Sequence, residues 1–224
     1  IKINSQNKEI ETKSFKEFDI DFITKNMTAK KEKKTKKKAE KGKNVELFKY
    51  DLDDIIVKDD GGAILIGEQY FVKVINHTYT DANGNQRSRQ TYYYNYNDII
   101  VVNINPEGSI DWAKKIAKKQ ITVNDQGFYS SYVLSVVKDK LYFIFNDHPN
   151  NLLYEPGKKL HSFNNKISLK GNESLVVLVE VDSEGNQTRE ALFSSKEADI
   201  ITRPKVCEQT NNKELILFGQ RKKS

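Results

Sequence analysis

The chain has 224 residues, of which 37% are hydrophobic and 30% charged, with 11 Tyr and 11 Phe. Aromatic residues at this frequency are typical of a folded domain and argue against a disordered chain. Four Pro and 11 Gly exclude a collagen-like protein, the single Cys excludes an internal disulfide, and no apolar run is long enough for a membrane-spanning helix.

The net charge of +6 is concentrated in one segment. Between residues 25 and 43 the chain has ten Lys and two Glu, a local charge of +8, so the remaining residues sum to −2. We therefore expect the folded body to be close to neutral and the basic character to belong to one insertion.

Residues 25–46 are predicted to form this inserted basic helix and a linker. Lys, Ala and Glu favour helix, Thr28 or Asn26 can cap its start, and Gly42 can end it. Because the segment has no apolar stripe, we expect it to lie in solvent. Its charge could bind nucleic acid, anionic lipid or acidic polysaccharide, and the candidate polyanion-binding residues are Lys30, Lys33, Lys34, Lys37 and Lys41.

The alternative is a solvated insertion, and we favour it. Lysine lacks the planar fork of arginine that recognises phosphate, and the run has no interleaved aromatic residues. We therefore do not expect nucleic acid as a partner.

From residue 47 onward, two kinds of hairpin alternate. In the first kind, over residues 47–70, 132–146 and 200–220, apolar runs flank a turn that contains Asp, Asn or Gly. In the second kind, over residues 98–116 and 174–193, Asp or Asn opens the turn and Gly closes it. The predicted turns are Lys58–Gly62, Lys138–Asp139, Asn211–Asn212, Asn105–Gly108 and Asp182–Gly185.

Equivalent positions of successive hairpins lie about 75 residues apart, as between Asn105 and Asp182, and such self-similarity is typical of repeat folds. The predicted fold class is mostly β, with antiparallel four-stranded repeat units arranged as a complete or partial β-propeller and one inserted lysine-rich helix. Residues 47–117 and 118–196 are the two full units. Residues 197–224 are the first hairpin of a third unit, and residues 1–24, with a turn at Asn4–Asn7, are the second hairpin of a preceding or closing unit.

Three units are fewer than the roughly 4–8 blades of a propeller. We therefore expect a longer repeat array, or other chains, to complete the ring.

Three segments carry a family resemblance: DDGGAILIGEQY at residues 59–70, YYYNYNDIIVVNINPEGSIDWAKKI at residues 92–116, and KLYFIFND at residues 140–147. They resemble secreted propeller-like repeat proteins of unknown function from Bacteroidetes. The resemblance implies a propeller fold and an extracytoplasmic location, in the periplasm or at the cell surface. It implies no catalytic residues and no cofactor.

Two long inserts, residues 76–97 and 147–172, are the candidate binding loops, because propellers bind ligands through loops at their faces. Exposed tyrosines can stack on sugar rings or on partner side chains. The alternative for the tyrosine cluster is a strand that turns one tyrosine face into the core. The candidate ligand-binding residues are Tyr92, Tyr94, Tyr96, Arg87, Arg89 and His148.

No catalytic or metal-binding motif is present in the sequence: the three histidines, His77, His148 and His161, lack the spacing of metal ligands. The loop TDANGN at residues 80–85 has alternating Asp and Asn but lacks the closing Glu of a calcium loop, so we interpret it as a turn.

The predicted function is that of a non-catalytic cell-envelope or surface binding protein, with a glycan or another envelope protein as its partner and no cofactor or metal. Two alternatives stay open. A carbohydrate-active enzyme on a propeller scaffold would need a pocket with at least two converging carboxylates. A polyanion binder would use the lysine-rich helix.

Overall fold

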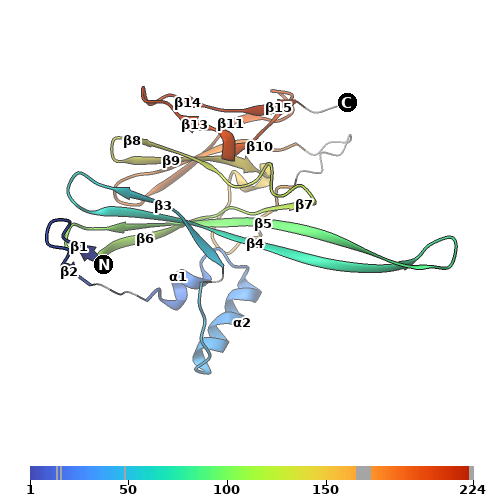
Figure 1. Ribbon diagram of the computed structural model, residues 1–224, viewed down its shortest axis with the longest axis horizontal. Helices are drawn as coiled ribbons and strands as arrows, with labels where there is room; N and C mark the ends of the chain where they lie inside the picture. The colour runs from blue at the N-terminus through green and yellow to red at the C-terminus, as the bar shows by residue number, and fades with distance from the viewer. Residues whose placement is uncertain (14, 16, 48, 165–172, 222–224) are drawn as a thin grey trace. The chain divides into compact units, whose positions relative to one another are not determined.

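The computed structural model describes residues 1–13, 15, 17–47, 49–164 and 173–221 of the chain (Figure 1). The described residues are mostly β, as the sequence predicts. The helices are α1 (Ile20–Thr24) and α2 (Ala29–Glu40), with short 3-10 turns η1 (Pro149–Asn151) and η2 (Pro204–Val206). The strands are β1 (Lys2–Ile3), β2 (Ile10–Thr12), β3 (Tyr50–Val57), β4 (Ala63–Thr80), β5 (Gln86–Ile104), β6 (Ile110–Ile116), β7 (Gln120–Val123), β8 (Val133–Val137), β9 (Lys140–Asp147), β10 (Leu175–Val181), β11 (Gln187–Ser194), β12 (Ile200–Thr202), β13 (Glu208–Gln209), β14 (Leu215–Ile216) and β15 (Gly219–Arg221).

The two main sheets are antiparallel meanders. Strands β3, β4, β5 and β6 are hydrogen-bonded in sequence order, with β7 added alongside β5, and strands β8, β9, β10 and β11 are also paired in sequence order. Strands β1 and β2 pair with each other, as do β12 with β15 and β13 with β14. No sheet in the described residues closes into a ring or barrel, so the propeller remains a proposal.

The chain divides into two compact units. The first comprises Ile1–Gln69, Asp98–Ala117 and Tyr154–Lys159, and the second comprises Tyr70–Asn97, Lys118–Leu153 and Leu160–Ser224. Strands β4 and β5 each begin in one unit and end in the other, so these units do not follow the predicted repeat ranges. Each unit is described below by itself.

Five hairpin turns share one hydrogen-bonding pattern, in which the first residue donates to the carbonyl four residues later and accepts from the N–H three residues later. The fourth position has positive φ in every case, which suits glycine and is strained for other residues. This confirms the turns predicted at Lys58–Gly62, Asn105–Gly108, Asp182–Gly185 and Asn211–Asn212, the last of which begins at Thr210. It also confirms the interpretation of residues 80–85 as a turn, which begins at Asp81. The fourth residues are Gly61, Gly84, Gly108, Gly185 and Lys213, with φ of 86°, 80°, 85°, 77° and 66°.

The predicted insert at residues 76–97 is a hairpin and not a loop. Strand β4 continues to Thr80 and β5 starts at Gln86, so only a tight turn separates them, as Figure 1 shows. Asp81 Oδ1 accepts the backbone N–H groups of Asn83 and Asn85, which is the turn interpretation of this segment. Tyr79 and Thr80 precede the turn, Thr91 and Tyr92 lie further along β5, and both residue types favour strand. Of the second insert, residues 165–172 lie outside the described part of the chain.

The prediction of a hairpin over residues 1–24 is correct only for its first part. Strands β1 and β2 form the hairpin, but residues 20–24 form helix α1, with the Asp19 side chain accepting the N–H of Phe22 at 2.7 Å. The signal in the sequence was Asp19 followed by Asp21, because a capping Asp and an acidic first turn both stabilise a helix start.

Helix α2 matches the predicted basic helix, but it is not exposed to solvent on every face. It ends at Glu40, and Gly42, with a φ of 67°, terminates it two residues later. The N–H of Lys43 bonds to the carbonyl of Lys38 at 3.1 Å. One stripe, at i, i+3, i+4 and i+7, is partly buried. Its members are Glu32, Thr35, Lys36 and Ala39.

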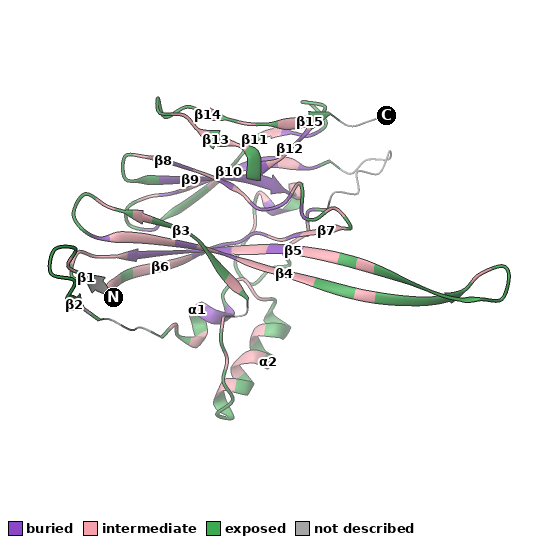
Figure 2. Ribbon diagram, in the orientation of Figure 1, coloured by how far each residue is buried: buried purple, intermediate pink, exposed green. Residues whose placement is uncertain are grey.

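Each unit has an apolar core built from its central strands (Figure 2). In the first unit Ile66, Ile99, Val101 and Ile116 are fully buried. In the second unit the fully buried side chains come from β9 and β10, and burying each contributes about 1.5–3 kcal/mol. They are Phe143, Phe145, Val177 and Val181.

Candidate functional site

A surface groove of about 610 Å³ lies on the β4–β5 hairpin and the end of β7, within the second unit. Two tyrosines line it: Tyr79, with 53% of its surface exposed, and Tyr93, which is half-buried. Its cationic and polar members are Arg89 and Asn124, together with the exposed imidazole of His77 on β4. The full lining is His77, Tyr79, Arg89, Thr91, Tyr93, Val123 and Asn124.

Local structure explains why Asn124 lies in the groove. Strand β7 pairs with β5 so that Val123 faces Tyr93, and the chain must leave the sheet at the next residue. Asn124 does so with φ of 54°, a left-handed conformation that Asn tolerates better than most residues. Its N–H donates to the carbonyl of Tyr92 at 3.0 Å, and its Oδ1 accepts the N–H of Tyr92 at 2.9 Å.

Strand alternation separates the predicted tyrosines from the groove. Successive side chains of a strand point to opposite faces, so Arg89, Thr91 and Tyr93 share one face of β5, and Tyr92 and Tyr94 lie on the other. The sequence pattern drew attention to the even-numbered tyrosines, whereas the groove uses the odd-numbered positions. Of the predicted ligand-binding residues, the structure brings only Arg89 into the groove.

Two other predicted residues on the hairpin, Tyr92 and Arg87, have partners of their own. The hydroxyl of Tyr92 donates to Gln90 Oε1 at 2.7 Å. Arg87 forms an ion pair with Asp81 at 2.9 Å, and both of them lie at the turn. Exposed ion pairs add little stability, so we expect this pair to contribute little to folding. It does engage the Arg87 guanidinium at the turn.

Tyr96 belongs to the core of the second unit, with only 5% of its surface exposed. Lys205 donates to its hydroxyl at 2.7 Å and lies 4.2 Å from its ring centroid. On another side, a Cβ added at Gly127 would overlap the ring, so the glycine makes room for it. The alternative considered for the tyrosine cluster, one tyrosine in the core, therefore describes Tyr96.

His148 lies in a polar cluster around Asp147, also in the second unit. Its ring stacks on that of His161, with centroids 4.9 Å apart, and its Nδ1 accepts the N–H of Asn150 at the start of η1. Burial and the neighbouring His161 charge lower the pKa of His148. These contacts shape the loop and occupy the imidazole.

Asp147 is fully buried and both of its carboxylate oxygens are occupied. Oδ2 pairs with Arg189 at 3.1 Å, and Oδ1 accepts from Asn151 at 2.6 Å and from the N–H of His148 at 2.8 Å. Burial raises the pKa of Asp147, although Arg189 and these hydrogen bonds favour the ionised form. Sequence alone showed Asp147 next to His148, but the arginine comes from β11, 42 residues away.

A second buried polar group cross-links the loops of this unit. Gln120 Nε2 donates to the carbonyl of Asn146 at 2.8 Å, and Gln120 Oε1 accepts from the N–H of Ser131 and from Lys118 Nζ. Asn146 Nδ2 donates to the carbonyls of Tyr129 and Thr202, both at 2.8 Å. The side chains of Lys118, Gln120 and Asn146 are fully buried, so these bonds hold segments that are distant in sequence.

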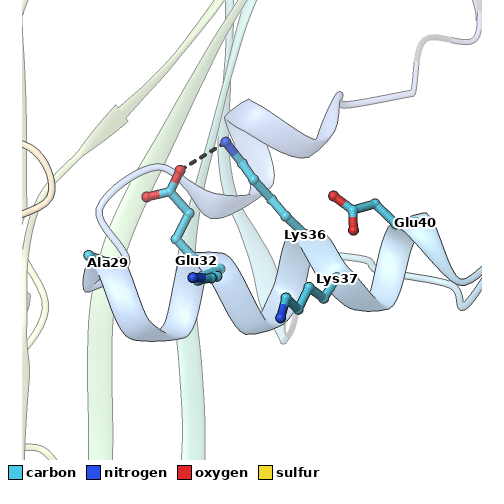
Figure 3. A pocket seen from close by; sticks show the side chains of 6 residues that line it. Ala29, Glu32, Lys36, Lys37 and Glu40 are labelled. Atoms are coloured by element: carbon cyan, nitrogen blue, oxygen red, sulfur yellow. Dashed lines mark ion pairs between the residues drawn. The ribbon is translucent and has the colours of Figure 1, made fainter.

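The predicted polyanion-binding lysines are exposed on α2 or at its end, in the first unit. A shallow groove of about 330 Å³ runs along the helix, lined by Ala29, Glu32, Lys33, Lys36, Lys37 and Glu40 (Figure 3). Within it Lys36 is held by Glu32 at 2.9 Å and by Asp21 of α1 at 2.7 Å. Lys36, which was not among the predicted residues, therefore anchors the helix, whereas the predicted Lys30, Lys33, Lys34, Lys37 and Lys41 are exposed.

No protein-family model matches the chain, and no curated protein or solved structure matches it either. No helix in the described ranges is both long and apolar enough to cross a membrane. Over the same residues, no group of three or more His, Cys, Asp or Glu side chains is arranged to hold a metal ion.

Proposed function

We propose that this chain is a non-catalytic binding protein of the cell envelope or surface, with a propeller-type repeat array, and that it binds a glycan in the groove on the β4–β5 hairpin. The observation that carries the proposal is the lining of the groove. Tyr79 and Tyr93 supply apolar ring faces, and Arg89 and Asn124 supply hydrogen-bonding groups beside them.

These residue types fit a sugar ring. The C–H face of a sugar packs on an aromatic ring, and its hydroxyl groups bond to planar polar side chains. A volume of about 610 Å³ is within the range of small-ligand sites. Strand positions fix the two rings more firmly than a loop would, so little ordering is needed on binding.

The same lining favours binding over glycoside hydrolysis. Hydrolysis commonly needs two carboxylates on either side of the scissile bond. The groove offers aromatic, cationic and amide groups, while the buried Asp147 is already bonded through both oxygens.

Native affinity electrophoresis tests the proposal with a panel of soluble neutral and acidic polysaccharides. We expect at least one polysaccharide to retard the protein. Tyr79→Ala and Tyr93→Ala should each weaken the affinity about tenfold, because losing an aromatic ring that packs on the sugar costs about 1.4 kcal/mol. Tyr92→Ala is the matched control, since Tyr92 is on the opposite face of the same strand and 38% exposed. Equal effects of Tyr92→Ala and Tyr79→Ala, or no retardation by any polysaccharide, would refute the proposal.

A second candidate function is polyanion binding through α2. The five named lysines are exposed on one short helix or at its end, which concentrates positive charge in a body that is otherwise near neutral. Retention on heparin, with and without replacement of all five by Gln, tests it. Elution at the same salt concentration would end this candidate, and Lys36→Gln controls for loss of the anchor to α1.

A further inference from the structure

Arg203 has a different environment from the other four arginines of this protein. Arg87, Arg189 and Arg221 each form an ion pair with an aspartate, and Arg89 is exposed in the groove. The guanidinium of Arg203 is partly buried, yet it has no carboxylate and no hydrogen-bond acceptor among the described residues. Its Nε is buried without a partner, and its terminal nitrogens reach the surface.

Aromatic rings fix the orientation of this guanidinium. Its Cζ lies 3.2 Å from the ring centroid of Phe128 and 5.7 Å from that of Phe218. The two rings are 37% and 47% exposed, so they form an apolar surface around the cation. Tyr129 extends it, with its ring 5.0 Å from that of Phe128 in an edge-on arrangement.

The backbone that carries the site is held as firmly as the rings. Arg203 N–H donates to the carbonyl of Phe218 at 2.9 Å, and the carbonyl of Arg203 accepts the N–H of Val206 at 3.1 Å. The buried Asn146 amide ties the residue before Arg203 to the residue after Phe128, through the carbonyls of Thr202 and Tyr129. A cation fixed in this way loses little freedom when an anion binds.

We propose that Arg203 binds a carboxylate carried by an apolar body, such as an aryl or alkyl acid. The two terminal nitrogens present parallel N–H groups that match both oxygens of a carboxylate. Phe128 and Phe218 contact the apolar body of the ligand beside its carboxylate. The site is separate from the groove in its residues and does not rest on the glycan proposal.

Arginine side-chain NMR tests this site directly, because the chain has only five arginines and so gives five Nε–H signals. Arg203→Lys identifies its signal by removing it. Phe128→Leu identifies it a second time, by removing the ring current that the stacked Phe imposes on it. Phenylacetate is the probe, phenylacetamide is its neutral analogue, and inorganic phosphate is an anion without an apolar body.

We expect phenylacetate to shift the Arg203 signal saturably at millimolar concentration. Phenylacetamide and phosphate should bind at least about tenfold more weakly, because each lacks one of the two recognised groups. Arg203→Lys should weaken binding, measured on the backbone N–H signals of Phe128 and Phe218. Arg89→Lys and Tyr79→Ala should leave binding unchanged.

Three results would overturn the proposal: no saturable shift, equal shifts at all five arginines, or binding that Arg203→Lys leaves intact. Phosphate binding as strong as that of phenylacetate would overturn the apolar part of it. The comparison of phenylacetate with phenylacetamide uses the unmodified protein, so it decides the matter even if a variant fails to fold.

Discussion

Lys115 on β6 should make the stability of the protein depend on alkaline pH. Its side chain is 4% exposed, and its Nζ donates to the carbonyl of Ile23 at 3.0 Å, in the last turn of α1. The rings of Phe22 and Tyr50 lie 5.2 and 6.0 Å from the Nζ. Burial lowers the pKa of Lys115 to about 8, and the charge of Asp98 only partly opposes this effect.

The direction follows from proton binding in the two states. The pKa of Lys115 is about 8 in the folded protein and 10.5 in the reference state, so between these values the unfolded chain binds more protons. The contribution of Lys115 to the free energy of unfolding is therefore lowest below pH 8 and rises as the pH increases toward 10.5. For these two pKa values, the gain in the free energy of unfolding from about pH 7 to about pH 9 is about 1.3 kcal/mol.

Urea denaturation of the wild type and of Lys115→Met at both pH values isolates this effect. Met keeps the length of the apolar stem and removes the titrating group, so the difference in free energy of unfolding between the two proteins should change by about 1.3 kcal/mol in favour of the wild type at the higher pH. Lys73→Met, at an exposed position of β4, is the control and should show no such change. A difference for Lys115→Met that is the same at both pH values would refute the reasoning.

Three further predictions concern the second unit. Asp147→Asn leaves a buried guanidinium without its carboxylate and should lower the free energy of unfolding by about 3–5 kcal/mol in urea denaturation, whereas a loss below about 1 kcal/mol would contradict the buried pair. Gly127→Ala should cost about 2–4 kcal/mol, because the new Cβ overlaps the Tyr96 ring at a φ of 71°, and Gly84→Ala, in open space at a φ of 80°, should cost about 1 kcal/mol; equal losses would contradict the overlap. Since the pKa of His148 is lowered on folding, the melting temperature should fall as the pH drops from about 7 to about 5, and His148→Asn, which keeps an acceptor at the start of η1, should show a smaller fall.

The turns and their flanking strands were predictable because local residues determine them. A tight hairpin turn needs positive φ at one position, and Gly108 and Gly185 provide it within four residues of the Asn or Asp that opens the turn. The alternation of apolar residues then predicts the strands on both sides. For this reason the sequence predicts the four strands of each meander and their order in the sheet.

The length of the β4–β5 hairpin was missed for a physical reason. Residues 80–89 are almost all polar, and a polar run with Gly and Asn is typical of a loop. In the structure this run is a hairpin end exposed on both faces, where strand pairing alone fixes the backbone. A strand without a buried face lacks the apolar alternation that sequence analysis depends on.

The groove was missed because its residues come together through pairing and not through sequence proximity. Which side chains of β5 share a face with Val123 depends on the register between β5 and β7, and this register depends on contacts of Gln120 and Asn124 that no local pattern indicates. The tyrosine cluster offered both faces, and the sequence gives no reason to choose Tyr93 over Tyr92.

The buried amides of Gln120 and Asn146 connect the fold of the second unit to the proposed site at Arg203. A buried amide that bonds to two backbone carbonyls holds those segments in one arrangement, because any slip leaves the polar atoms unpaired at a cost of about 1–3 kcal/mol each. An apolar side chain of the same size would fill the space equally well without fixing the two segments. The polar residues in this core therefore determine how Phe128 and Arg203 face each other, and the cation and its rings keep that geometry before any ligand arrives.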